Sequence, residues 1–307
     1  MIQVENLCRR YGPHTALDGI SFEAAPGEVV GLLGPNGAGK TTTMRILTGF
    51  MPPTSGRAVV AGFDVQTQSM QARGAVGYLP ERVPLYPDMT VVGYVTFWAQ
   101  MRGIRKAKAA AQQALEQVDL WDRRRSLVRS LSKGMRQRLG LAQALVHDPA
   151  VVILDEPTIG IDPQQVIDVR QAVRGLGAKH TVLFSTHILT EAEQVCDRVV
   201  ILNQGRIVAQ GTPSELRATL YAGDRLYVEV GKLNADAALK ALKSATGVAR
   251  VEPSGSGYLV YGQPNIDARP HVAGKIAAAG GLIVELRPVA LTLEDIFLNL
   301  VTKAGPR

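Results

Sequence analysis

The chain has 307 residues, 46% of them hydrophobic, and a formal net charge of +7, which is enough for one large domain with a sizeable core and a small second one. Its longest apolar runs, such as VVIL at 151–154 and 199–202, are far shorter than the roughly 18–20 residues of a bilayer span, and the N-terminus lacks the apolar centre of a signal peptide. The two cysteines, Cys8 and Cys196, fit neither a disulfide framework nor a metal pattern. We therefore expect a soluble cytoplasmic protein.

The first predicted elements are short strands over residues 2–33, and the last of them is the apolar run VVGLLG at 29–34. A glycine-rich loop follows, and then a helix from about Lys40 to Thr48, which we expect to end at Gly49. A strand, a glycine loop and a helix in this order are the context that a phosphate-binding loop needs.

The loop itself, GPNGAGKT at 34–41, fits the pattern G-x-x-x-x-G-K-[ST]. Its backbone N–H groups and the helix N-terminus can surround phosphates, Lys40 can reach the β- and γ-phosphates, and the Thr41 hydroxyl can ligate Mg²⁺. The sequence therefore predicts a site for ATP and Mg²⁺. The residues that we expect to bind ATP here are Gly34, Pro35, Asn36, Gly37, Ala38, Gly39, Lys40, Thr41 and Thr42.

The next region, residues 85–148, is predicted to be a helical subdomain within an α/β domain. Apolar residues recur at helical spacing in 91–103, where Val92, Val95, Trp98 and Ala99 form the expected buried face, and again in 106–120. Between residues 102 and 138 there are eleven Lys and Arg and only three acidic residues. This excess is either a solvated surface or a face near nucleotide phosphates or lipid headgroups, and the lack of interleaved aromatic residues argues against nucleic acid.

The α/β alternation then resumes with VVILDEP at 151–157, a fully buried strand by its continuous apolar run. Asp155 at the end of this strand is placed to hold Mg²⁺, and Glu156 can polarise the attacking water. Further on we expect a helix at 164–177, a strand at 180–186, a helix at 188–197 and a hairpin at 198–211. Lys40 and Glu156 are predicted catalytic residues.

After about residue 219 the pattern changes to β-α-β-β-α-β, the order of a ferredoxin-like α+β fold. A last amphipathic helix is predicted over 292–303. We therefore expect a P-loop α/β domain over residues 1–218 and an accessory domain over 219–307.

LSKGMRQR at 131–138 begins like a second phosphate-binding sequence, because Ser132 and the backbone N–H of Gly134 lie at the N-terminus of a predicted helix. With this segment the chain resembles the ATP-binding subunits of ABC transporters, whose signature motif it matches. In that family two cassettes sandwich two ATP molecules head to tail. The resemblance therefore implies a homodimer in which Ser132 and Gly134 of one copy close over the phosphate loop of the other.

The resemblance covers residues 1 to about 215 and implies further roles. Tyr11 is similar to the aromatic residue that stacks on adenine, and Asp162 to the D-loop aspartate near the dimer interface and the ATP. His187 is similar to the switch histidine that contacts the γ-phosphate, which makes it a predicted catalytic residue beside Lys40 and Glu156. Where the signature usually has Gly-Gly-Gln, this chain has Lys133, Gly134 and Met135, so the second glycine is kept. The other two changes are familiar in the subgroup that drives ABC-2-type exporters.

The largest departure is Glu81, where the family mostly has a glutamine that ligates Mg²⁺. A carboxylate can also ligate Mg²⁺, so Thr41, Glu81 and Asp155 are the expected metal ligands. The alternative is that Glu81 is an ordinary loop residue facing solvent. With a glutamate at this position, the chain also resembles the exporter subgroup that includes the ATPases of gliding motility and of nitrous-oxide-reductase maturation.

The resulting hypothesis is a motor subunit that binds and hydrolyses ATP at the cytoplasmic face of the cell membrane, dimerises on ATP and drives a separate integral-membrane permease, as an exporter. No nucleic-acid partner is expected. Two alternatives stay open. One is a soluble ABC ATPase of translation or DNA repair, although such proteins usually carry two cassettes or a long coiled coil. The other is a ligand-sensing module whose C-terminal domain binds a small regulator.

Overall fold

The chain forms two compact units, residues 1–213 and 214–307, in a computed structural model that describes residues 1–220, 225–263 and 266–289. The predicted boundary after residue 218 lies inside the helix α8 (Pro213–Leu220), which spans both positions. The predicted helix at 292–303 lies outside the described residues. Among the described residues, no helix has the length and apolar character that crossing a membrane requires.

The first unit begins with an antiparallel sheet. Its strands are β1 (Ile2–Tyr11), β2 (His14–Ala24), β4 (Ser55–Val60) and β5 (Phe63–Asp64), in the order β2-β1-β4-β5. The helix α1 (Lys40–Leu47) contributes Met44, Ile46 and Leu47 to a core that also takes apolar residues of this sheet and of a second sheet. Because α1 begins directly after the glycine loop, this core fixes the loop between the two sheets.

The second sheet carries the site. Its strands are β3 (Val29–Leu33), β6 (Val76–Leu79), β7 (Val151–Asp155), β8 (Thr181–Thr186), β9 (Arg198–Asn203) and β10 (Arg206–Gly211), in the order β10-β9-β3-β8-β7-β6. All pairs are parallel except that of β10 with β9. Every residue of β3, β7 and β8 is buried, as the continuous apolar run of β7 predicts for that strand. The register pairs Leu33 with Thr186 and Asp155 with Ser185, so the three strands end at one edge.

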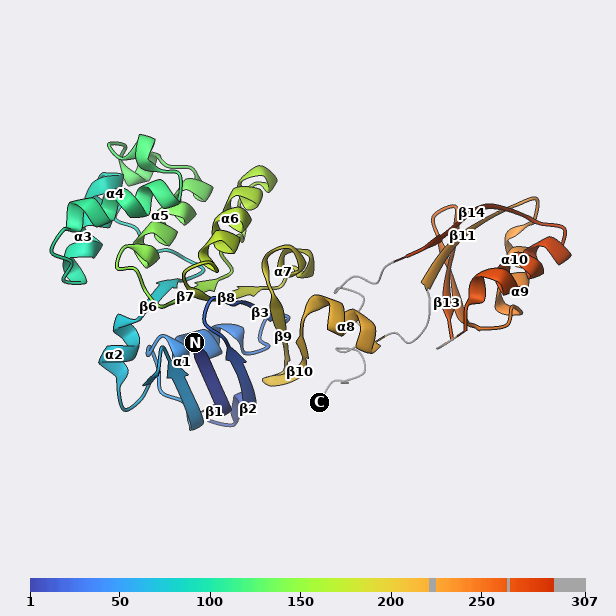
Figure 1. Cartoon of the computed structure of the whole chain (residues 1–307), viewed down its shortest axis with the longest axis horizontal. Helices are drawn as coiled ribbons and strands as arrows, with labels where there is room; N and C mark the ends of the chain where they lie inside the picture. The colour runs from blue at the N-terminus through green and yellow to red at the C-terminus, as the bar shows by residue number, and fades with distance from the viewer. Residues whose placement is uncertain (221–224, 264–265, 290–307) are drawn as a thin grey trace. The chain divides into compact units, whose positions relative to one another are not determined.

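The helical region consists of α3 (Val91–Met101), α4 (Ala107–Gln117), the short 3₁₀ turns η1 (Trp121–Arg123) and η2 (Val128–Ser130), and α5 (Lys133–Leu145). Figure 1 shows α3, α4 and α5 grouped beyond the sheet edge formed by β6. The predicted face of α3 is partly wrong, because Val91, Tyr94, Val95 and Ala99 are buried while Val92 and Trp98 are only half-buried. The Tyr94 hydroxyl donates to the Gln143 side chain, so this aromatic residue turns inward.

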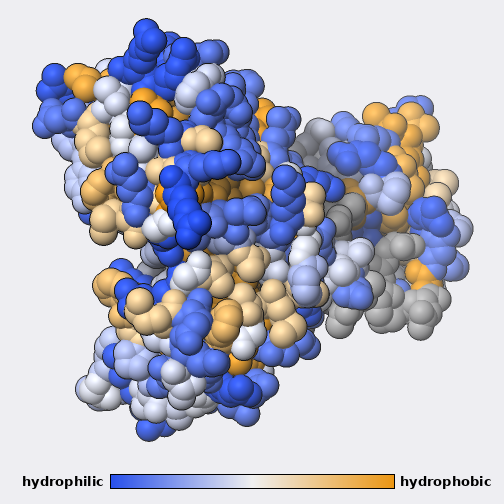
Figure 2. All heavy atoms as spheres, turned by 60° about the vertical axis from the view of Figure 1, so that its left-hand side comes forward, coloured by the Kyte–Doolittle hydropathy of each residue, from blue (hydrophilic) through white to orange (hydrophobic). Residues whose placement is uncertain are grey.

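Part of the basic excess of this region is structural. Arg102 donates to the carbonyl oxygens of Arg73 and Val76, at 3.0 and 3.4 Å, and burial lowers the pKa of its guanidinium. Arg138 is 12% exposed and forms an ion pair with Asp119 at 3.4 Å. On the face shown in Figure 2, hydrophilic side chains predominate and hydrophobic ones form small patches between them.

Three more helices belong to the first unit. They are α2 (Ser69–Gly74), α6 (Pro163–Leu176) and α7 (Leu189–Val195), and the last two follow β7 and β8 along the chain. Asp162 caps α6, since its Oδ1 accepts from the Gln165 backbone N–H at 3.1 Å.

Both cysteines are free, Cys196 buried and Cys8 half-buried.

The second unit has the predicted β-α-β-β-α-β order. Its elements after α8 are β11 (Arg225–Gly231), α9 (Ala235–Lys243), β12 (Val248–Ser254), β13 (Gly257–Gly262), α10 (Ala268–Ala278) and β14 (Leu282–Pro288). The sheet is antiparallel in the order β12-β13-β11-β14, which is the ferredoxin-like arrangement. Its own core includes Val228, Val260, Leu242, Val272 and Ile276, so this unit buries its apolar residues independently of the first.

Candidate functional site

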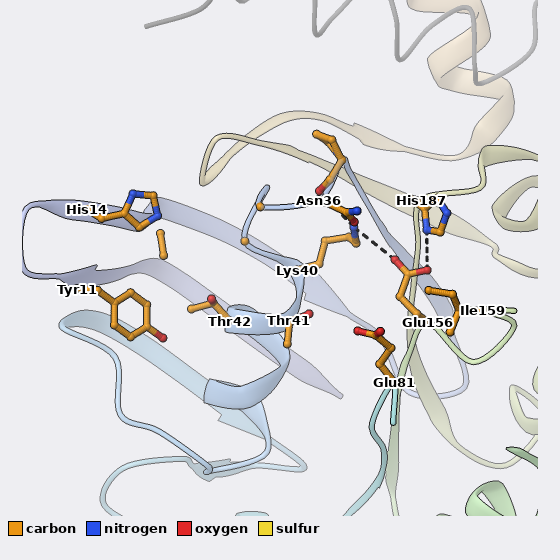
Figure 3. A pocket seen from close by; sticks show the side chains of 14 residues that line it. Tyr11, His14, Asn36, Lys40, Thr41, Thr42, Glu81, Glu156, Ile159 and His187 are labelled. Carbon is orange, nitrogen blue, oxygen red and sulfur yellow. Dashed lines mark hydrogen bonds and ion pairs between the residues drawn. The ribbon is translucent and has the colours of Figure 1, made fainter. Parts of the chain in front are cut away.

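A pocket of about 550 Å³ opens where the glycine loop meets the carboxyl ends of β7 and β8 (Figure 3). Most of the residues expected to bind nucleotide line it. The lining consists of Tyr11, His14, Ala16, Pro35, Asn36, Gly37, Gly39, Lys40, Thr41, Thr42, Glu81, Glu156, Ile159 and His187. The structure therefore brings together residues from five places in the chain that sequence reasoning assigned to one site.

The shape of the glycine loop depends on Gly39. Its φ is 109°, in the left-handed region, and it is the N-cap of α1. A Cβ at this position would lie 2.6 Å from Leu17 Cδ2 and 2.9 Å from the Ala16 carbonyl oxygen. Only glycine fits, and the loop can therefore turn directly into α1 with the helix N-terminus facing the pocket.

Lys40, the first residue of α1, is 6% exposed and makes three contacts at the bottom of the pocket. Its Nζ donates to the carbonyl oxygens of Gly34, at 2.6 Å, and Pro35, at 3.3 Å, and forms an ion pair with Glu156 Oε1 at 3.5 Å. A buried ammonium needs such partners, because an unpaired charge away from water is very costly. The loop and the end of β7 are thus joined through this one side chain.

Asp155 and Glu156 follow each other but face different partners. Asp155 Oδ1 accepts from Ser185 Oγ at 2.7 Å. Burial raises the pKa of Asp155 above its ordinary value, and the negative charges of Glu156 and Glu81 act in the same direction, whereas the hydroxyl groups of Ser185 and Thr41 act against it. A cation bound here would reverse that shift.

Glu156 turns away from Asp155 because its φ of 48° is left-handed, which is unusual for a residue with a side chain. Its backbone N–H donates to Ser185 Oγ at 3.0 Å. Its Oε2 lies 2.8 Å from His187 Nδ1 while its Oε1 faces Lys40. The dashed lines in Figure 3 trace these two contacts, which place one carboxylate between a cation and an imidazole.

Tyr11 lies at the other end of the pocket lining, on β1 (Figure 3). It is 42% exposed, its hydroxyl donates to Met51 Sδ at 3.1 Å, and the Arg9 guanidinium lies 4.8 Å from the centre of its ring. An accessible ring beside a cation is suited to stacking on a flat base.

Five expected ATP-binding residues do not line this pocket, and three of them lie outside the glycine loop: Ser132, Gly134 and Asp162. Ser132 caps α5, and its Oγ accepts from the Met135 backbone N–H at 3.2 Å. Gly34, Ala38 and Asp155 are also absent from the lining, but they lie directly behind it in the loop and next to Thr41.

Several residues near the pocket were not predicted. His14 and Ile159 line it, and each stands in a segment that the family resemblance had singled out for a neighbour, Tyr11 and Asp162. Ser185 was missed although it bonds both Asp155 and Glu156, because a serine in a buried strand carries no signal of its own.

The donor set around Thr41 fits Mg²⁺. The Thr41 hydroxyl and the charge of Glu81 both act on the Asp155 carboxylate, and all three side chains offer the hard oxygen ligands that this ion prefers. No group of three or more His, Cys, Asp or Glu among the described residues could hold a metal by itself.

Gly134, at the second position of α5, touches the next helix along the chain. A Cβ on Gly134 would overlap the Oε1 atom of Gln165 on α6 and would lie 2.6 Å from its Cδ. This oxygen is buried and has no hydrogen-bond partner among the described residues. The absence of a side chain at Gly134 is therefore what allows α5 and α6 to approach at their N-termini.

Comparisons with known proteins agree with this geometry. The model of the ABC transporter family matches residues 17–159. The daunorubicin resistance ATP-binding protein DrrA3 of Streptomyces coeruleorubidus is 38% identical over 97% of this chain and 95% of its own. The Nod factor export ATP-binding protein I of Paraburkholderia xenovorans (strain LB400) is 38% identical over 97% of this chain and 96% of its own. A solved ATP-binding subunit of an ABC transporter is 32% identical, with a TM-score of 0.65 over 71% of this chain and 92% of that one.

The contact between Gly134 and Gln165 predicts that substitutions at the two positions are not additive. With Gln165 replaced by alanine, Gly134→Ala should stabilise the protein by about 1 kcal/mol, since alanine is the better helix former. With Gln165 present, the added methyl group must displace its side chain, so we expect this gain to be lost, with a coupling of roughly 0.5–3 kcal/mol. Urea unfolding of the two single variants and the double variant measures this. Equal effects of Gly134→Ala in both backgrounds would contradict the contact.

Proposed function

The chain belongs to the ABC transporter family as an ATP-binding subunit, and we propose from this that it is the motor of an exporter whose membrane pathway lies on separate permease subunits. The relatives that it matches over nearly their whole length are named for drug resistance and for Nod factor export. The second of these names describes outward transport. The proposed permease and the proposed export direction both come from this likeness.

We also propose that two copies of the chain form the working unit. The observation that carries this proposal is the composition of the pocket, which holds the phosphate loop, Glu156 and His187 but lacks Ser132, Gly134 and Asp162. Residues suited to phosphate therefore occur on two separate surfaces of one chain. A second copy in reverse orientation brings the Ser132 surface of each chain against the loop of the other, so that each ATP is held from both sides.

The reaction proposed for this site is attack of water on the γ-phosphate. Glu156 is the general base, because its carboxylate is placed in the pocket between Lys40 and His187, at 3.5 and 2.8 Å. Lys40 and the N-terminus of α1 stabilise the phosphate charge. Mg²⁺ held by Thr41, Asp155 and Glu81 would neutralise phosphate oxygens. Tyr11 positions the adenine at the far end.

ATP binding then closes the dimer and hydrolysis reopens it, since contacts to the γ-phosphate across the interface are lost when this group leaves. The free energy of those contacts is available to move a permease. The second unit, residues 214–307, is proposed to be an accessory domain, and the peripheral position at the cytoplasmic face of the membrane follows from the permease partner.

Two other functions have less support. A role in translation or DNA repair would require that the similarity to exporter ATPases over 97% of this chain be misleading.

A sensing role for the second unit is compatible with transport. A thermal shift of the full chain with candidate metabolites tests it, and a shift that remains after Tyr11→Ala would assign binding outside the nucleotide pocket.

The general-base role predicts that Glu156→Gln abolishes turnover while ATP still binds. The amide keeps the size of the side chain but cannot accept the proton of water, and with the γ-phosphate intact the variant should accumulate as an ATP-bound dimer. Hydrolysis and size-exclusion chromatography with ATP measure the two effects, with Glu193→Gln on α7 as the matched control. Normal hydrolysis by Glu156→Gln would show that another group activates the water.

The two-copy arrangement predicts complementation between different lesions. Ser132→Arg and Lys40→Ala homodimers should each be inactive, because every composite site contains one damaged half. In a mixed dimer one site carries both lesions and the other carries neither, so hydrolysis should return. The mixed dimer is isolated through two affinity tags. A complex proven to contain both chains that stays inactive would argue against the shared site.

The proposed metal role of Glu81 predicts a changed Mg²⁺ requirement. Glu81→Gln removes one of the negative charges that act on Asp155, so more Mg²⁺ should be needed for half-maximal hydrolysis, while the affinity for ATP without metal stays the same. Titration of hydrolysis with Mg²⁺ measures this, with the neighbouring Arg82→Gln as a control. An unchanged titration would make Glu81 an ordinary loop residue.

A further inference from the structure

Glu191, on α7, is 1% exposed and holds three partners from three different segments. Its Oε2 accepts from the hydroxyls of Thr158, at 2.8 Å, and Thr186, at 2.9 Å. Its Oε1 accepts from the Arg170 guanidinium at 3.0 Å. A carboxylate this deeply buried requires such compensation, and here the compensation comes from hydroxyls as well as from the cation.

The two hydroxyls belong to the segments that carry the reacting groups. Thr158 stands two residues after Glu156, and Thr186 stands directly before His187. Thr186 Oγ1 also accepts from the Ile188 backbone N–H at 3.0 Å, so it fixes the turn on both sides of His187. The segment after β7 and the turn after β8 are therefore each held to Glu191 by one hydroxyl, that of Thr158 and that of Thr186.

Together these contacts form a closed ring. It runs from Glu156 along the chain to Thr158, across to Glu191, back to Thr186, along the chain to His187, and through the 2.8 Å contact to Glu156. We propose that Glu191 is a positioning residue for ATP hydrolysis, which sets the placement of His187 against the Glu156 carboxylate. This inference rests on the proposed function of that carboxylate.

Arg170 extends the ring to α6. It donates to Glu191 and, at 2.9 Å, to the Gln194 side chain, and it lies on the helix that Asp162 caps. A displacement of the segment from Thr158 to Asp162 therefore acts on the bond between Thr158 and Glu191. If this segment meets a second copy, Glu191 is the group through which that contact reaches His187.

The alternative is that Glu191 has a purely structural role. A structural role and a positioning role predict different effects of a substitution at Glu191. A structural carboxylate would lower the melting temperature when replaced and would lower kcat only as far as the protein unfolds. A positioning residue lowers kcat in the folded protein and leaves KM for ATP unchanged, because Glu191 lies outside the lining of the pocket.

The test measures steady-state ATP hydrolysis and thermal unfolding of the full chain with Thr158→Val, Thr186→Val and Glu191→Gln. Each valine removes one hydroxyl while keeping the shape of the side chain, and Glu193→Gln on the same helix is the control for the glutamine. We expect kcat to fall by up to about 10²-fold in all three variants, the size that a displacement of about 1 Å can cause, at unchanged KM. Where Glu191→Gln does not fold, the two valine variants decide.

A double-mutant comparison separates positioning from damage elsewhere. If Glu191 acts through His187, then Thr186→Val should add little to His187→Ala in single-turnover hydrolysis, whereas independent effects multiply. Wild-type kcat in the three folded variants, or full multiplication in the double variant, would overturn the proposal. Absence of hydrolysis in the wild-type chain would instead overturn the proposed function.

Discussion

The ion pair between Lys40 and Glu156 is the contact on which the described site depends. It joins the glycine loop after β3 to the end of β7, and both side chains are buried, so each charge needs the other as a partner. The parallel register of β3, β8 and β7 makes the pair feasible, because it brings all three strand ends to one edge. The fold and the charge distribution therefore constrain each other: the sheet places the two charges, and the charges stabilise the loops that leave the sheet.

Contiguous motifs could be predicted from the sequence because their chemistry is carried by neighbours in the chain. The glycine loop, the buried strand that ends in Asp155 and Glu156, and the order of the ferredoxin-like unit all follow from local spacing. The gathering of these motifs into one pocket was foreseen from the family resemblance.

Contacts between distant segments could not be predicted in the same way. The bonds of Ser185 to Asp155 and Glu156, and the approach of Gln165 to Gly134, depend on which strands and helices become neighbours. The buried face of α3 was shifted for a related reason. Its apolar positions fit more than one helical stripe, and the packing of Tyr94 and Val91 against other helices selects the stripe that is buried.

The left-handed backbone at Glu156 has a consequence for how this protein can change. Glycine adopts such a conformation freely, whereas a residue with a side chain is strained by roughly 1–2 kcal/mol. The chain thus keeps a carboxylate at a backbone position that glycine would occupy with less strain. Replacing Glu156 by glycine would relieve this strain but would leave the buried Lys40 ammonium without its ion pair, so backbone strain and charge pairing oppose each other at this one peptide unit.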